Sequence, residues 1–235
     1  MRKHIRLFLF LPSCYNSHNN GKEHGMITKE QFEKALEERQ TREVREKLRE
    51  GCVAVAGLGG LGSHIALMLA RTGIRRLLLV DFDQVDVSNL NRQAYTIDQI
   101  GMPKTEAMKQ RISQINPWIE LEFFQGKVTR ENAASIFKGY PVICEAFDGA
   151  EEKAMLVNTV LEQLPDSVVI SGSGMAGAYS SNLIKTRKVM QRLYLCGDET
   201  YGVSDEESLT AARVSICAGH EANMAVRLLL GETDV

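Results

Sequence analysis

The stretch that decides the fold is VAVAGLGGLGS, residues 53–63. An apolar run typical of a buried strand leads into four glycines within six residues, and the segment HIALMLARTG that follows is typical of a helix. Glycines lack a Cβ atom, so a turn rich in them lets the backbone come close to another group. That group is a dinucleotide, a nucleoside triphosphate or only the neighbouring helix.

The glycine turn has the arrangement of a nucleotide site. Gly57, Gly59 and Gly62 fit the pattern G-x-G-x-x-G between a strand and a helix, with Gly60 among them. The glycines permit the turn and admit a phosphate, and the helix N-terminus attracts the anion. Asp81, near the end of the next apolar run, lies close to the spacing of a carboxylate that binds a ribose hydroxyl. The pattern predicts a nucleotide but does not choose between a dinucleotide and ATP.

Apolar runs alternate with helical patterns along most of the chain. Strands without polar alternation are buried on both faces, so the pattern predicts an α/β fold: a Rossmann-like, doubly wound, mainly parallel sheet covered by helices. The further strand-like runs are 75–83, 118–124, 141–148 and 167–174, and the helical patterns are 61–72, 103–115, 129–138 and 150–164.

The two ends of the chain have different patterns. Residues 28–50 predict a charged N-terminal helix, in which Thr28 and Gln31 form a capping box. Residues 178–198 alternate like exposed antiparallel strands, and 213–230 predict a final helix. The sheet should therefore carry a C-terminal antiparallel extension.

The domain boundaries follow from the same patterns. We expect a single domain over residues 26–235, which is long enough for a full α/β core. The basic start and short apolar run of residues 1–25 lack the length and cleavage site of a signal peptide. These residues are expected to be disordered, or to precede a true start at Met26.

Composition gives no support to several classes of partner. The net charge of −2 gives no reason to expect a nucleic acid or an anionic membrane, and no apolar run is long enough to span a bilayer. The five cysteines form no C-x-x-C pair, so no zinc site is expected. Unclustered cysteines in odd number suggest a reducing compartment, and we expect a cytoplasmic protein.

Charged residues beyond the glycine turn favour ATP over a dinucleotide. Asn89, Arg92 and Lys104 follow the second strand, and two cations at a sheet edge suit a reaction that develops negative charge on phosphate. Asp148 ends a later strand, and with Asp81 it could hold Mg²⁺.

Each of these residues also has a structural explanation. Arg92 could pair on the surface with Asp83 or Asp86, and Lys104 could be an exposed helix residue. Asp148 could cap the following helix. All three in this order at strand ends favour the functional interpretation.

Several motifs resemble one known family. GLGGLGS, VDFDQVDVSNLNRQ, IGMPKTEAM, INPWIELE and EAFDGAEEKAMLVN resemble the adenylating domain shared by ThiF, MoeB and the ubiquitin-activating enzymes. The resemblance covers about residues 40–230, and the compact spacing is most similar to the ThiF-like proteins of thiamine biosynthesis. It implies an adenylyltransferase that uses ATP and Mg²⁺ to activate the C-terminal Gly-Gly carboxylate of a ubiquitin-like, ThiS-like sulfur carrier.

The resemblance also implies roles for individual residues. Arg92, Lys104 and Asp148 would be catalytic, with Asp148 as the magnesium ligand. Family members are homodimers in which an N-terminal arginine reaches the partner's ATP; Arg39 is the candidate here, with Arg42 second. The residues expected around the nucleotide within the chain are Gly57, Gly59, Gly60, Gly62, Asp81, Asp83, Asn89, Arg92, Gln93, Lys104 and Asp148.

Three alternatives stay open. One is a non-catalytic carrier-binding protein that kept the fold and lost activity, and the intact Arg92, Lys104 and Asp148 argue against it. A sibling enzyme would adenylate a MoaD-like molybdopterin carrier, or the threonylcarbamoyl group on a tRNA. An NAD-dependent oxidoreductase would explain the glycines but would leave Arg92 and Lys104 without a role.

Many relatives carry two zinc-binding C-x-x-C pairs that are missing here. Cys196 and Cys217 are expected to be buried small residues rather than sulfur-transfer groups.

Overall fold

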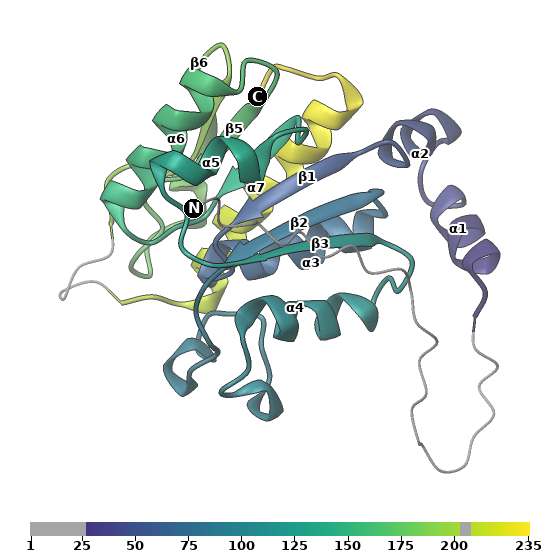
Figure 1. Cartoon of the computed structure of the whole chain (residues 1–235), viewed down its shortest axis with the longest axis horizontal. Helices are drawn as coiled ribbons and strands as arrows, with labels where there is room; N and C mark the ends of the chain where they lie inside the picture. The colour runs from purple at the N-terminus through teal and green to yellow at the C-terminus, as the bar shows by residue number, and fades with distance from the viewer. Residues whose placement is uncertain (1–26, 203–207) are drawn as a thin grey trace, which may run out of the picture.

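The computed structural model describes residues 27–202 and 208–235, so the prediction for residues 1–25 concerns a segment outside it. Seven strands form a sheet in the order β3-β2-β1-β4-β5-β7-β6 (Figure 1), with all neighbours parallel except β6 and β7. The predicted Rossmann-like, mainly parallel fold is confirmed. The strands are β1 (Cys52–Ala56), β2 (Arg76–Asp81), β3 (Glu120–Gln125), β4 (Val142–Glu145), β5 (Val168–Gly172), β6 (Lys185–Met190) and β7 (Leu193–Gly197).

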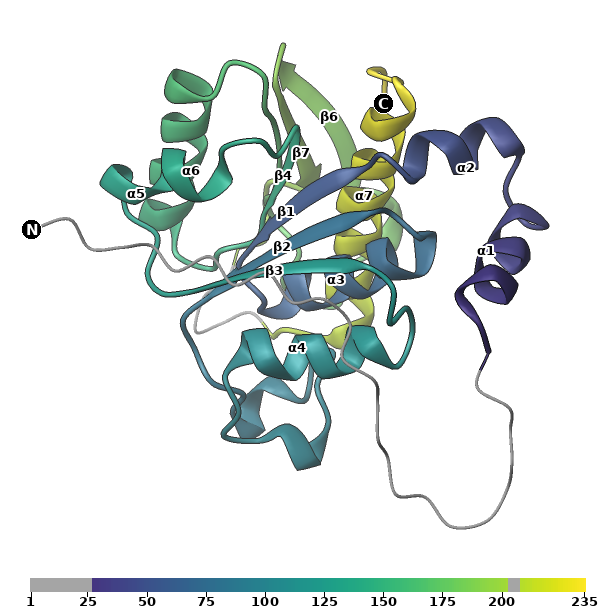
Figure 2. The same ribbon diagram turned by 45° about the vertical axis from the view of Figure 1, so that its right-hand side comes forward.

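Helices pack on both faces of the sheet. Side chains of β1 alternate between two hydrophobic clusters, Val53 and Val55 in one and Ala54 and Ala56 in the other. The first cluster includes residues of α3 (Gly60–Thr72), α4 (Lys104–Ser113) and α7 (Ala211–Leu230), and the second includes residues of α5 (Arg130–Phe137) and α6 (Ala150–Gln163). Figure 2 shows α5 and α6 on the opposite side of the strands from α3 and α7. Burial on both faces is why these strands read as continuous apolar runs.

The C-terminal extension takes the predicted antiparallel form. Strands β6 and β7 pair antiparallel, and β7 also pairs parallel with β5. Helix α7 then packs along α3, with Val214, Cys217 and Ala218 in the first cluster. This helix therefore joins the last part of the chain to the element that follows the glycine turn.

The N-terminal segment forms two helices where the sequence predicts one over 28–50. Helix α1 (Lys29–Glu37) has the predicted capping box at Thr28, but Thr41 begins a second helix, α2 (Arg42–Leu48), by accepting a hydrogen bond from the backbone N–H of Val44 at 3.3 Å. Gln40 between them donates to the carbonyl of Thr72 at 3.0 Å. Both halves keep helical spacing, so periodicity alone does not reveal the break.

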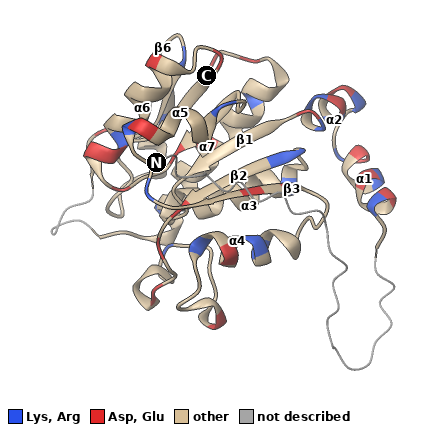
Figure 3. Cartoon of the chain, viewed as in Figure 1, with Lys and Arg blue, Asp and Glu red and all other residues tan. Residues whose placement is uncertain are grey.

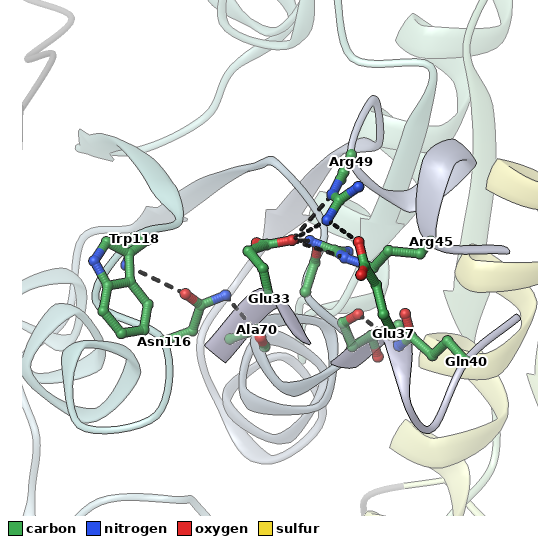
Figure 4. A network of polar contacts seen from close by, with 10 residues as sticks. Glu33, Glu37, Gln40, Arg45, Arg49, Ala70, Asn116 and Trp118 are labelled. Atoms are coloured by element: carbon green, nitrogen blue, oxygen red, sulfur yellow. Dashed lines mark hydrogen bonds and ion pairs between the residues drawn. The ribbon is translucent and has the colours of Figure 1, made fainter. Parts of the chain in front are cut away.

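Ion pairs hold the two N-terminal helices together. Glu33 pairs with Arg45 and Arg49 at N–O distances of 2.8 and 2.9 Å, and both guanidinium groups point toward its carboxylate (Figure 4). Burial alone would raise the pKa of Glu33, but the two guanidinium groups outweigh it and lower that pKa. Arg45 is buried and also donates to the carbonyl of Gly73 at 2.6 Å, so α2 is fixed to the end of α3.

Charge is mixed rather than segregated on these helices. Figure 3 shows basic and acidic residues alternating along α1 and α2, and pairs such as Arg42–Glu46 lie four residues apart. In the described part of the chain no helix has the length and apolar character needed to cross a membrane.

Candidate active site

A cavity of about 570 Å³ opens at the carboxyl ends of the central strands. Parallel strands of an open α/β sheet end at the same edge, which is where such folds bind ligands. The lining comes from the turn after β1, the ends of β2, β3, β4 and β5, and the start of α7. The predicted site residues that line it are Gly57, Gly59, Gly60, Asp81, Asp83, Arg92, Gln93, Lys104 and Asp148.

The glycine turn makes the floor of this cavity possible. Gly57 has φ +92°, a conformation that side-chain-bearing residues rarely adopt. A Cβ atom on Gly62 would lie 1.8 Å from the carbonyl oxygen of Gly57, so the helix can begin this close to the strand only with glycine there. Gly59 is the N-cap of α3 and makes no side-chain cap, which leaves the first N–H groups of the helix to a ligand.

Asp81 links the turn to the second strand. Its carboxylate accepts from the backbone N–H of Leu58 at 2.6 Å and from that of Asp83 at 2.8 Å. Burial raises the pKa of Asp81, and the positive charge of Lys104 opposes that rise. The residue therefore shapes the turn in addition to lining the cavity, and the predicted ribose contact would be a further role.

The loop after β2 brings Arg92 and Gln93 to the cavity. The Arg92 guanidinium donates to the carbonyl of Ser88 at 3.1 Å and to the side chain of Asn91 at 2.8 Å. The backbone carbonyl of Arg92 lies 3.1 Å from Nε2 of His64 on α3. Gln93 Oε1 is buried without a hydrogen-bond partner among the described residues, as expected of an acceptor that awaits a ligand.

Lys104 lies at the first position of α4 with its side chain 7% exposed. Its Nζ is 2.9 Å from Asp83 Oδ2, so the surface pairing considered for Arg92 is made by Lys104 instead. Pro103 precedes it and directs the chain into the helix. Lys104 therefore brings a buried positive charge to the cavity wall, with Asp83 as its ion-pair partner.

Three predicted residues have other positions. Asn89 does not line the cavity; its Oδ1 accepts from the backbone N–H of Asp86 at 3.0 Å and caps a short 3-10 helix, Val87–Asn89. Arg39 is exposed between α1 and α2, near the amino ends of the strands and away from the cavity of its own chain. Gly62 lies beneath the turn rather than on the cavity surface.

A family model described as the ThiF family matches residues 32–235. The chain belongs to the ThiF family. The match covers the whole sheet, both N-terminal helices in large part, and α7. The resemblance inferred from the sequence motifs is thereby confirmed at the level of the family.

Three curated relatives represent different branches. The chain is 31% identical over 189 residues to the ubiquitin-like modifier-activating enzyme 5 of Arabidopsis thaliana, covering 74% of this chain and 43% of the relative. It is 38% identical over 124 residues to the tRNA threonylcarbamoyladenosine dehydratase of Escherichia coli, covering 52% and 46%. It is 36% identical over 107 residues to the sulfur carrier protein adenylyltransferase of Thermus thermophilus, covering 45% and 40%. The chain thus spans less than half the length of each.

A solved structure extends the likeness of fold to nearly a whole chain. The E. coli tRNA N6-threonylcarbamoyladenosine dehydratase in complex with ATP superposes with a TM-score of 0.78 at 21% identity. The match covers 88% of this chain and 97% of the other. At this identity the comparison establishes the shared fold.

Sequence reasoning missed several cavity residues of this ThiF-family chain. Lys127 lies two residues after the end of β3, and ligands of open α/β sheets bind at such strand ends. Lys153 on α6 lines the cavity and pairs with the fully buried Glu145 at 2.5 Å. No local sequence pattern predicts this contact. Ser171 donates to the same carboxylate at 2.6 Å. Phe82 and Phe147 add apolar surface.

Three of the described cysteines lack the surroundings of a reactive thiol. Cys144, Cys196 and Cys217 are free and buried, and burial raises the pKa of each thiol, with Glu221 raising it further. A buried thiol of raised pKa is a poor nucleophile, which agrees with the expectation for Cys196 and Cys217. Within residues 27–202 and 208–235 no group of three or more His, Cys, Asp or Glu side chains is placed to hold a metal ion.

Proposed function

We propose that this chain adenylates a carboxylate with ATP. The observation that carries the proposal is that an uncapped helix N-terminus and two cations, Arg92 and Lys104, meet in one cavity at the sheet edge. The volume falls within the range of about 300–1,000 Å³ that small-molecule sites occupy. Membership of the ThiF family supports an adenylating enzyme.

In the proposed reaction a carboxylate oxygen of the acceptor attacks the α-phosphorus of ATP, and the bond to the pyrophosphate oxygen breaks. The products are an acyl-adenylate and pyrophosphate. Both reactants are anions, so Arg92 and Lys104 would neutralise charge and align them. The step needs no nucleophile from the protein, which fits a cavity whose nearby thiols are buried.

Asp148 is the proposed magnesium ligand. It is exposed at the cavity, whereas both carboxylate oxygens of Asp81 already accept backbone hydrogen bonds. Magnesium sites in such enzymes use one or two carboxylates together with substrate phosphates, so a single cavity carboxylate is compatible with this metal. Bound Mg²⁺ would withdraw charge from the phosphate oxygens.

Two classes of acceptor are candidates. The tRNA threonylcarbamoyl group, the sequence alternative, is supported by relatives named as dehydratases of that nucleoside and by the extent of the structural match. The ThiS-like or MoaD-like carrier, the main expectation for thiamine biosynthesis, is supported by relatives that activate a ubiquitin-like modifier or a sulfur carrier. The comparisons favour the tRNA acceptor, which runs against the expectation, drawn from a net charge of −2, of no nucleic-acid partner.

A homodimer is the proposed assembly. The exposed position of Arg39, distant from its own cavity, is compatible with a role in a partner's site, with Arg42 as the second candidate. Light scattering gives the oligomeric state, and mixing Arg39→Ala with Arg92→Ala chains tests whether activity returns in heterodimers. We also propose a cytoplasmic location, because the described cysteines are unpaired.

The decisive experiment is ATP–pyrophosphate exchange with Mg²⁺. Purified carriers ending in Gly-Gly and tRNA containing threonylcarbamoyladenosine are tested separately, beside Arg92→Ala as the inactive control. Exchange that depends on one acceptor and disappears in the variant supports adenylation and names the acceptor class. A chain that binds ATP but gives no exchange with any of them would remove the proposal.

A further inference from the structure

The β5 side of the cavity is formed by segments from three parts of the chain. We call this surface the β5 wall; its cavity-lining residues are Gly172, Ser173, Gly174, Met175, Gly202 and Leu209. Gly172 is the last residue of β5 and the next three follow it, whereas Gly202 lies beyond β7 and Leu209 just before α7. Nothing local in the sequence joins these segments, so contacts over long sequence distances must set their relative positions.

Arg213 makes those contacts. It lies in the first turn of α7 with its side chain 3% exposed, and it does not line the cavity itself. Its guanidinium donates to the carbonyls of Tyr179 and Ser180 at 2.7 and 2.8 Å and pairs with the carboxylate of Asp198. One buried side chain therefore joins the segment after β5, the segment after β7 and the start of α7.

Asp198 links Arg213 to the backbone of the segment after β7. One of its oxygens accepts from the backbone N–H groups of Thr200 and Tyr201 at 2.8 and 2.9 Å. Burial alone would raise the pKa of Asp198, but these N–H groups and Arg213 outweigh it and lower that pKa. The carboxylate is thus ionised opposite the guanidinium, and a charge-assisted pair of this kind is strong and directional.

Backbone contacts also join the segments of the wall to one another. The N–H of Glu199 donates to the carbonyl of Ser173 at 2.9 Å, and the N–H of Ala176 donates to that of Tyr201 at 3.0 Å. A Cβ atom on Gly197 would lie 1.8 Å from the Ser173 oxygen. Glu199 itself adopts φ +56°, a conformation that a non-glycine residue keeps only when its surroundings impose it.

An aromatic stack covers the outer side of these contacts. The rings of Tyr179 and Tyr201 stack with centroids 3.7 Å apart, and Arg213 Cζ lies 5.6 Å from the Tyr179 ring. Tyr179 is 40% exposed, so the stack lies at the surface beside the segment that Arg213 holds. Cation–π contact adds to the hydrogen bonds of the same guanidinium.

The two sides of the cavity suit different reactants. The glycine turn and Asp81 lie at β1 and β2, where phosphate and ribose bind in folds of this kind, so the β5 wall remains for the acceptor. We propose that Arg213 is a positioning residue that holds the β5 wall in the geometry required by the acceptor carboxylate. This inference rests on the proposed adenylation, and Arg213 itself would touch neither reactant.

The test compares Arg213→Met with a matched variant. Arg192 is also an arginine that donates to backbone carbonyls, those of Leu161, Leu164 and Ser167, but it lies at the other end of β5 and β7, away from the cavity. Arg192→Met thus removes a similar set of bonds without touching the wall. Asp198→Asn is a milder second variant, because it removes only the charge that pairs with Arg213. It tests the wall if Arg213→Met does not fold.

The first readout is hydrogen exchange of the chain alone, followed by mass spectrometry. Arg213→Met should speed exchange in peptides covering 173–180 and 196–202 by about tenfold or more, and leave the β1–α3 peptides unchanged. Arg192→Met should leave both regions at the wild-type rate. Because this measurement needs no acceptor, it remains informative even where the proposed adenylation fails.

The second readout compares the KM for the acceptor with the KM for ATP in ATP–pyrophosphate exchange. The acceptor is the Gly-Gly carrier or the threonylcarbamoyladenosine tRNA, whichever supports the wild-type reaction. Arg213→Met should raise KM for that acceptor by about 10-fold to 100-fold, because small misplacements cost this much, while KM for ATP changes less than about twofold. Arg213→Lys should restore part of the loss, since its ammonium can still pair with Asp198.

Two results would overturn the inference. Unchanged exchange in the wall peptides of a folded Arg213→Met chain would show that the wall does not depend on this residue. Equal rises in the KM for the acceptor and the KM for ATP would show a general structural role. If the wild-type chain gives no ATP–pyrophosphate exchange with any acceptor, that result counts against the proposed function instead. The hydrogen-exchange comparison alone would then test whether Arg213 holds the wall.

Discussion

Two arginines on opposite sides of the cavity show how differently the same side chain is used. Arg92 lines the cavity, is half-buried, and bonds to Ser88 and Asn91, four residues and one residue away. Arg213 is buried behind the β5 wall and bonds to Tyr179, Ser180 and Asp198, between 15 and 34 residues away.

The difference indicates which property each residue should control. A side chain that bonds only within its own loop can be removed at little cost to the fold, so its loss should appear mainly in the reaction. A buried side chain that joins distant segments sets their positions, so its loss should appear in the shape and stability of the wall.

The largest expected effect is on the reaction. Arg92→Ala should lower the rate of acceptor-dependent ATP–pyrophosphate exchange by about 10²–10³-fold, the usual cost of one charge-stabilising donor. The free energy of unfolding in urea should change by less than about 0.5 kcal/mol. Arg130→Ala, which removes an exposed pair with Glu162, is the control and should leave both quantities near wild type. If Arg92→Ala lost as much stability as Arg213→Met, the two arginines would not differ in the way inferred here.

The next effect concerns the backbone of the glycine turn. Gly62→Ala should destabilise the chain by about 3 kcal/mol, because the added methyl group meets the Gly57 carbonyl at 1.8 Å. Gly59→Ala is the matched change, with no atom nearer than 3.9 Å, and should cost less than about 1 kcal/mol. Chemical denaturation of both variants measures the difference, and equal costs would mean that the turn relaxes more easily than its geometry indicates.

A third effect is a pH dependence behind the β5 wall. Glu221 is fully buried, neither oxygen has a partner among the described residues, and Oε1 lies 2.8 Å from where a Cβ of Gly172 would be. Burial raises the pKa of Glu221 well above its ordinary value; Lys153 opposes this and Glu145 adds to it. Three buried thiols also lie near, those of Cys144, Cys196 and Cys217.

The sign of that dependence follows from the raised pKa. The folded chain holds the Glu221 proton to higher pH than the unfolded chain does. The stability that this proton contributes is therefore fully present below the pKa of Glu221 in the unfolded chain. It is lost as pH rises through the pKa of Glu221 in the folded chain. The slope from this group approaches about 1.4 kcal/mol per pH unit. Glu221→Gln should remove that part of the slope in urea denaturation between pH 5 and 9. Parallel curves for the two proteins would mean that Glu221 is already ionised or solvated.

The smallest effect has the opposite sign. Gly219 lies within α7, and a Cβ atom there would have no neighbour within 4 Å. Gly219→Ala should stabilise the chain by about 0.5–1 kcal/mol, because alanine loses less backbone entropy in a helix. Thermal unfolding checks the gain, and exchange activity should be unaltered. A loss of stability would show that α7 has no room for a Cβ atom at this position.

How much of the site is predictable depends on how local its residues are. Gly57, Asp81 and Arg92 belong to continuous motifs at strand ends, so spacing alone was sufficient to bring them to one cavity. Asn89 belongs to the same motif but caps a short helix, because a side chain next to a turn competes for backbone groups that spacing does not reveal.

The residues that sequence reasoning missed have partners far along the chain. Lys153 pairs with Glu145, and Arg213 with Asp198; each is an ordinary charged residue in a charged segment when read alone. The break between α1 and α2 was missed for the same reason, since Gln40 bonds to the end of α3 and periodicity continues across the break.

The sequence by itself determined the alternation of strand and helix, the glycine turn and the edge of the sheet at which the cavity opens. These features depend on residues within a few positions of one another, where backbone conformation and side-chain period act directly. Only the tertiary structure decided that Lys104 rather than Arg92 pairs with Asp83, and that Arg213 joins the segments of the β5 wall. Such contacts require that segments distant in sequence be brought together, and for the β5 wall the packing of α7 against α3, β5 and β7 does this.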